Sequence, residues 1–278
     1  MSDTAGRVGP HRESHEPRLM ATKFLASDQT PVEGFLKWNG TANIGERWNM
    51  LGNDKWGDCG PAATNHYDMA KAQQPQLAGQ LGRPKFTGVL GTYFAYGMAM
   101  GEVGQPPNNP NQPDQGVDNA SWLGWLYKEG LIYGYGEVPL KYLDWFAQTA
   151  RGAICGLVID GNTAEADFSW SPKTPWSAMP NAADGHDVLL IITNGDGSGG
   201  LVTWGAVQPF DPTFRAQITD AWIIYDKDDP LVDHAALQGA LADVHGVVVS
   251  TPVETQADGF WAKVDHYVEK EFAKLSAA

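Results

Sequence analysis

Residues 187–205 limit the choice of fold more than any other part of the chain. An apolar run at 187–193 leads into a turn rich in Gly, Asn and Asp at 194–200, and a second apolar run follows at 201–205. Two apolar runs separated by such a turn are typical of a β-hairpin. Further apolar runs at 152–160 and 221–225 predict additional strands beside it.

Helical patterns fill the part of the chain that precedes these strands. Residues 62–72 predict a helix, and residues 118–130 predict another, which Asp118 or Asn119 can cap. A further helix is expected at 140–149. Because the helices come first and several adjacent strands follow, the sequence predicts an α+β fold rather than an alternating α/β fold.

The charge of the chain limits its partners. The formal net charge is −14, from 33 acidic against 19 basic residues, without a local basic patch. Such a charge repels phosphate backbones and anionic membranes, so neither nucleic acid nor membrane is expected as a partner. No apolar run approaches the roughly 20 residues that span a bilayer. The N-terminus lacks the apolar stretch of a signal peptide, so we expect synthesis in the cytoplasm.

Cys59 lies where a polar loop, residues 53–58, runs into the helix expected at 62–72. The first backbone N–H groups of a helix are unpaired, and the positive end of the helix dipole favours a thiolate over a thiol. This position is therefore suited to a nucleophilic cysteine. The alternative is a buried, unreactive cysteine, which is the more frequent case for an arbitrary Cys. Cys155 lies inside an apolar run and is expected to be a packing residue.

A nucleophilic cysteine needs a base, most often a histidine from a distant part of the chain. His186 follows Gly185 and opens the apolar strand at 187–193, so its ring can project from a rigid strand end. His66 is two helical turns from Cys59, roughly 10 Å, which is too far for a direct hydrogen bond. A single histidine at a strand end is more often structural. Together with Cys59, however, His186 becomes the candidate base.

These residues resemble the papain-like cysteine peptidase superfamily over roughly residues 45–226. The superfamily has a Gln six positions before its nucleophile, and Asn53 occupies that position here. Gly-His-Asp-Val at 185–188 is similar to the sequence around the superfamily's His, and Val-Thr-Trp-Gly at 202–205 is similar to its Asn-Ser-Trp-Gly. The sequence of these motifs also resembles a divergent branch of the superfamily found in bacteriophages and bacteria.

The resemblance implies a set of site residues and no metal or cofactor. They are Cys59 as nucleophile, His186 as base, Asn53 as oxyanion-hole donor, and Trp204, Trp56 and Thr203 as shielding or lining residues.

The main departure from the superfamily is Val202, which replaces the Asn that orients the catalytic His. A valine side chain cannot accept a hydrogen bond from the ring. Three alternatives remain open for the orienting role: Thr203, Gln208 and Asp187. The site can also work as a Cys–His dyad without an orienting group, or it can be degenerate.

The fold that the resemblance implies is an N-terminal helical subdomain, with the Cys helix, packed on a C-terminal antiparallel sheet or barrel that carries the His. We expect an extended N-terminal arm at 1–44, a papain-like domain at 45–226, and a C-terminal extension at 227–278 with an amphipathic helix. The expected function is a cysteine hydrolase that cleaves a peptide or amide bond in a peptide or protein substrate. The alternative is a catalytically degenerate structural or binding protein, such as a bacteriophage tail or capsid component. In that case the arm and the C-terminal helix would bind an assembly partner in the virion.

Overall fold

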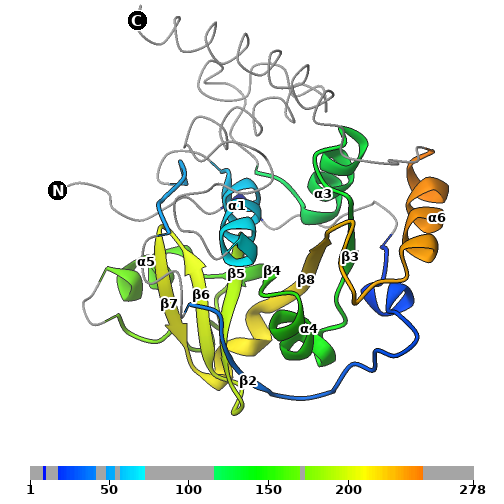
Figure 1. The fold of residues 1–278 in the computed structure, drawn as a ribbon. Helices are drawn as coiled ribbons and strands as arrows, with labels where there is room; N and C mark the ends of the chain where they lie inside the picture. Colours follow the sequence, from blue (N-terminus) through cyan, green and yellow to red (C-terminus); the bar gives the residue numbers. More distant parts are fainter. Residues whose placement is uncertain are drawn as a thin grey trace, which may run out of the picture.

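The computed structural model of the chain describes residues 9–10, 18–41, 48–53, 57–72, 116–169 and 173–246 (Figure 1). Within these residues the strands form one sheet, whose main path runs in the order β3-β8-β4-β5-β6-β7. Every paired strand in it is antiparallel. The strands are β1 (Gly9–Pro10), β2 (Lys37–Asn39), β3 (Gly134–Glu137), β4 (Ala153–Ile159), β5 (Asp184–Asn194), β6 (Gly199–Thr203), β7 (Ala206–Phe210) and β8 (Ile218–Tyr225).

Strand β5 is the centre of the sheet. It pairs with β4 and β6 along the main path, and the short strands β1 and β2 also pair with it. The middle of β5 is buried on both faces, with Val188, Leu189, Leu190 and Ile191 fully covered. A strand buried on both faces reads as a continuous apolar run instead of an alternating one, which explains the sequence pattern.

Helices cover the sheet and are started mainly by aspartates. The helices are η1 (Ala21–Phe24), α1 (Cys59–Ala72), α3 (Asn119–Lys128), η2 (Leu140–Tyr142), α4 (Leu143–Thr149), α5 (Gly161–Phe168), η3 (Pro212–Gln217) and α6 (His234–His245). Helix α1 packs on β5 (Figure 1). A side-chain oxygen accepts hydrogen bonds from the first turn in four cases, at Asp118, Asp160, Asp211 and Asp233.

The α+β class, the hairpin and the three helices predicted from sequence are confirmed. Eight of the described elements were not predicted: the strands β1, β2, β3 and β7, and the helices η1, α5, η3 and α6. Strand β3 is four residues long with two glycines, β7 contains Pro209, and α5 is short and polar. These features weaken strand and helix signals. Helix α6 carries only two buried apolar residues, Leu237 and Leu241, so its apolar stripe is narrow.

Part of the predicted N-terminal arm packs on the sheet. Leu19, Ala21 and Phe24 are buried in the main core, and the backbone N–H of Glu137 donates to the carbonyl of Leu19 at 2.7 Å. Residues 18–41 therefore belong to the packed unit. The amphipathic helix expected in the C-terminal extension lies outside the described residues, as does residue Trp56.

No helix in the described ranges combines the length and the apolar character needed to cross a bilayer.

Candidate active site

Cys59 is the first residue of α1, as the sequence predicted. Its side chain is buried, with 7% of its surface exposed. The sulfur Sγ donates a hydrogen bond to Oδ2 of Asp187 on β5 at 3.6 Å. The amide Nδ2 of Asn119, at the start of α3, donates to the other oxygen of this carboxyl group, Oδ1, at 2.7 Å. Two helix starts and one strand therefore meet at the thiol.

His186 lies on the opposite face of β5, because consecutive side chains of a strand point to opposite faces. Its Nε2 is hydrogen-bonded to Oγ1 of Thr203 at 2.6 Å. The indole of Trp204 lies over the ring, with centroids 5.2 Å apart. Nδ1 is buried without a hydrogen-bond partner. Within the described residues no hydrogen bond joins His186 to Cys59.

Of the three alternatives for orienting His186, Thr203 is the one in hydrogen-bond contact with the ring. Gln208 instead donates from Nε2 to the carbonyl oxygens of Thr174 and Pro209, at 2.7 and 2.9 Å. Asp187 is turned to the thiol. Trp204 covers the imidazole, as expected from the sequence.

Asn53 lies at the end of a loop with unusual backbone angles. Asn49, Leu51 and Gly52 all have left-handed φ values, of 61°, 59° and 106°. His66 holds this loop to α1, since its Nε2 lies 3.0 Å from the carbonyl oxygens of both Trp48 and Asn49. Two carbonyl partners require that Nε2 carries the proton. Strained backbone held by a buried side chain is a frequent property of functional loops.

The amide of Asn53 points toward the residue before the nucleophile. Its Nδ2 donates to Oδ1 of Asp58 at 3.4 Å, and both side chains are buried. The Asn53 amide therefore contacts the residue that precedes α1, and its role as an oxyanion-hole donor stays a prediction.

Burial keeps the thiol and its neighbours uncharged. Burial, and then the charge of Asp187, raise the pKa of the Cys59 thiol well above its usual value. Burial, and then the nearby Asp220, raise the pKa of Asp187 to about 8. Burial lowers the pKa of His186 to about 3. At neutral pH the site therefore holds a thiol and a neutral imidazole.

Two residues of this site have contacts that the sequence did not predict. The sequence suggests Asp187 only as an orienting partner for His186, and Asn119 only as a helix cap. The alternation of a strand offered a signal for Asp187, because it shows that residues 186 and 187 cannot both face one helix. Asn119 has no such signal, since its contact with Asp187 spans 68 positions of the chain.

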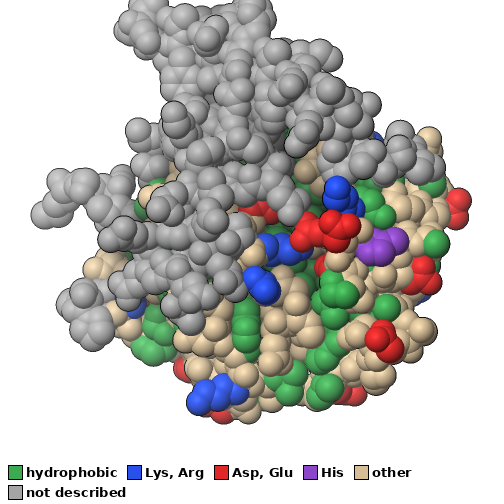
Figure 2. All heavy atoms as spheres, in the orientation of Figure 1, with side chains coloured by type: hydrophobic (Ala, Val, Ile, Leu, Met, Phe, Trp, Pro, Cys, Tyr) green, Lys and Arg blue, Asp and Glu red, His purple; other side chains and the backbone are tan. Residues whose placement is uncertain are grey.

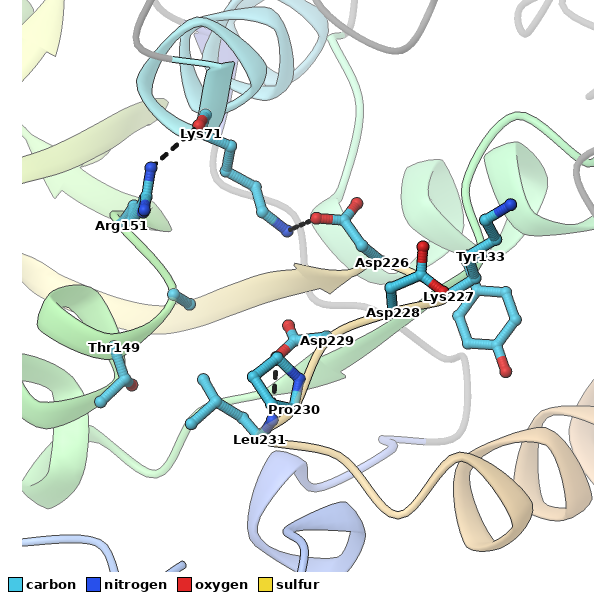
Figure 3. Close-up of a pocket in the computed structure, with 11 residues that line it drawn as sticks. Lys71, Tyr133, Thr149, Arg151, Asp226, Lys227, Asp228, Asp229, Pro230 and Leu231 are labelled. Atoms are coloured by element: carbon cyan, nitrogen blue, oxygen red, sulfur yellow. Dashed lines mark hydrogen bonds and ion pairs between the residues drawn. The ribbon is translucent and has the colours of Figure 1, made fainter.

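A separate hollow of about 770 Å³ lies at the other end of α1 (Figure 3). Lys71, in the last turn of α1, forms an ion pair with Asp226 at 2.7 Å on its wall. Lys71 is twelve residues from Cys59, about 18 Å along a helix. The hollow is therefore not part of the Cys59 site.

Charges of both signs lie beside one another on the face shown in Figure 2. Within the described residues no group of three or more His, Cys, Asp or Glu side chains is arranged to hold a metal ion.

No protein-family model matches this chain, and no curated protein has a significant sequence match to it. The likeness to papain-like peptidases therefore rests on the residues quoted above.

Proposed function

We propose that the chain is a cysteine hydrolase that cleaves a peptide or amide bond with Cys59 as the nucleophile. The observation that carries this proposal is the contact of 3.6 Å between Sγ of Cys59 and Oδ2 of Asp187 at the first turn of α1. A nucleophile and an acid–base group within hydrogen-bond reach, with the second held by a third group, is the arrangement that covalent catalysis needs. Asn119 is that third group.

Asp187 has the acidity that proton exchange with a thiol requires. A carboxyl group with a pKa of about 8 is closer in basicity to a thiol than an ordinary carboxylate is, so proton transfer between them is less uphill. When ionised, Asp187 takes the thiol proton as sulfur attacks the carbonyl carbon. It then gives that proton to the leaving amine, and water hydrolyses the thioester.

The oxyanion formed in the attack needs hydrogen-bond donors. We assign this role to the backbone N–H of Cys59, the first residue of α1, and to the amide of Asn53, which donates to Asp58 just before it. Asn53 would exchange its contact with Asp58 for one with the substrate oxygen. A donor of this kind contributes about 100-fold to 1000-fold in kcat in other hydrolases.

The resemblance implies His186 as the base, whereas the hydrogen bonds of the site favour Asp187 for the proton transfer. Thr203 and Trp204 hold and cover its ring, and Nδ1 has no partner. A base must come within hydrogen-bond reach of the proton it removes. The hydrogen bonds give that place to Asp187, so we assign it the proton transfer and His186 a supporting role on the opposite face.

The second candidate is a structural or binding protein on this fold, such as a virion component. The burial of Cys59 favours it, because burial raises the pKa of the thiol and leaves it unreactive.

A test begins with the full chain and a peptidyl vinyl sulfone probe, with the bound cysteine identified by mass spectrometry. A mixture of peptides is then digested and new termini are counted. The proposal predicts labelling of Cys59, which is 7% exposed, and not of Cys155, which is 0% exposed, and cleavage that Cys59→Ala abolishes and Cys155→Ala retains. Equal cleavage by wild type and Cys59→Ala would refute the hydrolase and favour the second candidate.

A further inference from the structure

Two carboxylates from different strands come together beside Cys59 because a glycine lies between them. In the sheet, Gly156 of β4 pairs with Asp187 of β5 on one side and with Asp220 of β8 on the other. A Cβ atom at position 156 would lie 2.4 Å from Oδ2 of Asp220. The absence of a side chain at Gly156 leaves the space into which the carboxylate of Asp220 extends.

One amide bridges the two carboxyl groups. Nδ2 of Asn119 donates to Oδ1 of Asp187 at 2.7 Å and lies 3.3 Å from Oδ1 of Asp220. The first contact fixes one oxygen of Asp187 and leaves the other facing the thiol. Asn119 is buried, so this amide has few alternative partners.

Asp220 is held in place independently of Asp187. The indole Nε1 of Trp222 donates to its Oδ1 at 2.5 Å, and Oγ1 of Thr219 donates to its Oδ2 at 3.2 Å. These two donors on β8 fix the position of the Asp220 carboxyl group next to Asp187. Its charge makes ionisation of Asp187 less favourable.

The other charged groups around Asp187 do not offset that charge. Asp58 precedes α1 and Asp118 precedes α3, and both are acidic. Glu137 of β3 lies near Asp220 and is paired with Arg18 at 2.6 Å. Cys59 on α1 contributes a thiol. Within the described residues no lysine or arginine forms an ion pair with Asp187.

We propose that Asn119 and Asp220 are positioning residues for Asp187: the amide of Asn119 bridges the two carboxyl groups and turns one oxygen of Asp187 to Cys59, and Asp220 places a second acidic group beside it. This inference rests on the proposed function for its catalytic meaning. Asn119 sets the direction of the carboxyl group, and Asp220 adds to the effect of burial on its ionisation.

The test measures the ionisation of Asp187 directly, by NMR titration of the full chain labelled with ¹³C at aspartate carboxyl carbons. Asp187→Asn identifies the signal. Asp220→Asn should lower the apparent pKa of Asp187 by about one unit, because a like charge is removed. Gly156→Ala should act in the same direction, since its methyl group displaces the Asp220 carboxylate. Asp226→Asn, at the far end of α1, is the control and should change nothing.

An Asp187 pKa that stays the same in Asp220→Asn and in folded Gly156→Ala would overturn the inference, whatever the activity. Absence of any hydrolysis by wild type would instead refute the proposed function, and the titration would still decide the role of Asp220. If both hold, the acidic limb of the pH–rate profile moves to lower pH in Asp220→Asn by the same amount as the titration.

Discussion

Two neighbouring titratable groups lie on opposite faces of β5 and make different contacts there. On one face His186 contacts a hydroxyl and an indole, from Thr203 and Trp204. On the other face Asp187 contacts the Cys59 thiol and the Asn119 amide. His186 and Asp187 are consecutive on β5, and this shift of one residue decides which of the two side chains meets the nucleophile. Proximity of Gly-His-Asp-Val to Cys59 in the fold is therefore not enough to name the base.

Burial shifts the pKa values of the two groups in opposite directions, and in both cases it favours the uncharged form. It lowers the pKa of the imidazole to about 3 and raises that of the carboxyl to about 8. Burial disfavours the charged form of each. Both groups are therefore mostly uncharged at neutral pH, and a rise in pH toward 8 ionises only the group beside the thiol.

The largest expected effect comes from exchanging each group for a neutral amide or alanine. Asp187→Asn removes the acid–base group in contact with sulfur and should lower kcat/KM by about 100-fold or more. His186→Ala should lower it by less than about 10-fold once corrected for the folded fraction. The measurement is hydrolysis of the best peptide found in the digestion test. The opposite order of effects would transfer the role of base to His186.

The pH dependence of the free energy of unfolding should report the shifted pKa values of the groups on both faces of β5. His186 and His66 have native pKa values of about 3 and about 4, below the usual 6.5, so the unfolded chain binds more protons below pH 6.5. Their contribution is lost as pH falls. Asp187 has a native pKa of about 8, above the usual 3.8, so the native chain binds the extra proton and this contribution is lost as pH rises.

At pH 5 the two histidines outweigh the carboxyl, so unfolding takes up close to one proton, and this uptake falls to zero near pH 6.5, where the unfolded histidines are half protonated. The free energy of unfolding should therefore rise by about 1 kcal/mol per pH unit near pH 5, level off near pH 6.5 and fall by somewhat less than about 1 kcal/mol per unit between pH 6.5 and 8. Urea unfolding at fixed pH values measures it. Asp187→Asn should remove the decline above pH 6.5, and a decline that persists in this variant would contradict the assignment.

A smaller effect is expected from the hydroxyl beside His186. Thr203→Val keeps the shape of the side chain and leaves Nε2 of a buried imidazole without its partner, which costs about 1–3 kcal/mol in the free energy of unfolding. Thr193→Val is the matched control, because Thr193 is buried on β5 and its Oγ1 has no hydrogen-bond partner. Urea denaturation should show a loss for the first variant and little or none for the second.

The smallest effect is expected from removing the caps of two helices, one beside Asp187 and one beside Trp204. Asp118 caps α3 on the Asp187 face, and Asp160 caps α5, whose Phe168 packs on Trp204. Each change to Ala should cost about 1 kcal/mol. Only Asp118→Ala should alter the rate of Cys59 alkylation by iodoacetamide, because Asn119 is the next residue. Equal alkylation rates in both variants would show that α3 does not position the site.

Much of the fold follows from local patterns, while the site depends on contacts between distant residues. The hairpin, the cap at Asp118 and the position of Cys59 at a helix start all depend on neighbours in the chain, so they could be predicted. The cover of His186 by Trp204 came from the resemblance. The bridge from Asn119 to Asp220 spans 101 positions and has no local signal.

The sequence also gave no means of weighing the helix dipole against burial at Cys59. The dipole depends on the helix start, which is a local feature, whereas burial depends on everything that packs around the thiol. In the structure, burial and then the charge of Asp187 raise the pKa of the thiol.

Two glycines that have no left-handed backbone angle set a rule for how sequences of this kind can vary. A Cβ atom at Gly60 would lie 2.4 Å from Cγ2 of Val117, and one at Gly156 would lie 2.4 Å from the Asp220 carboxylate. A Cβ at Gly60 would also lie 3.2 Å from Oδ2 of Asp187, so Val117 is its tightest but not its single partner. In related sequences, a residue larger than glycine at position 156 should occur together with a loss of the acid at position 220, and position 60 should vary with position 117. An alignment of relatives would then show the residues of each pair changing together, because they share the limited space beside the thiol.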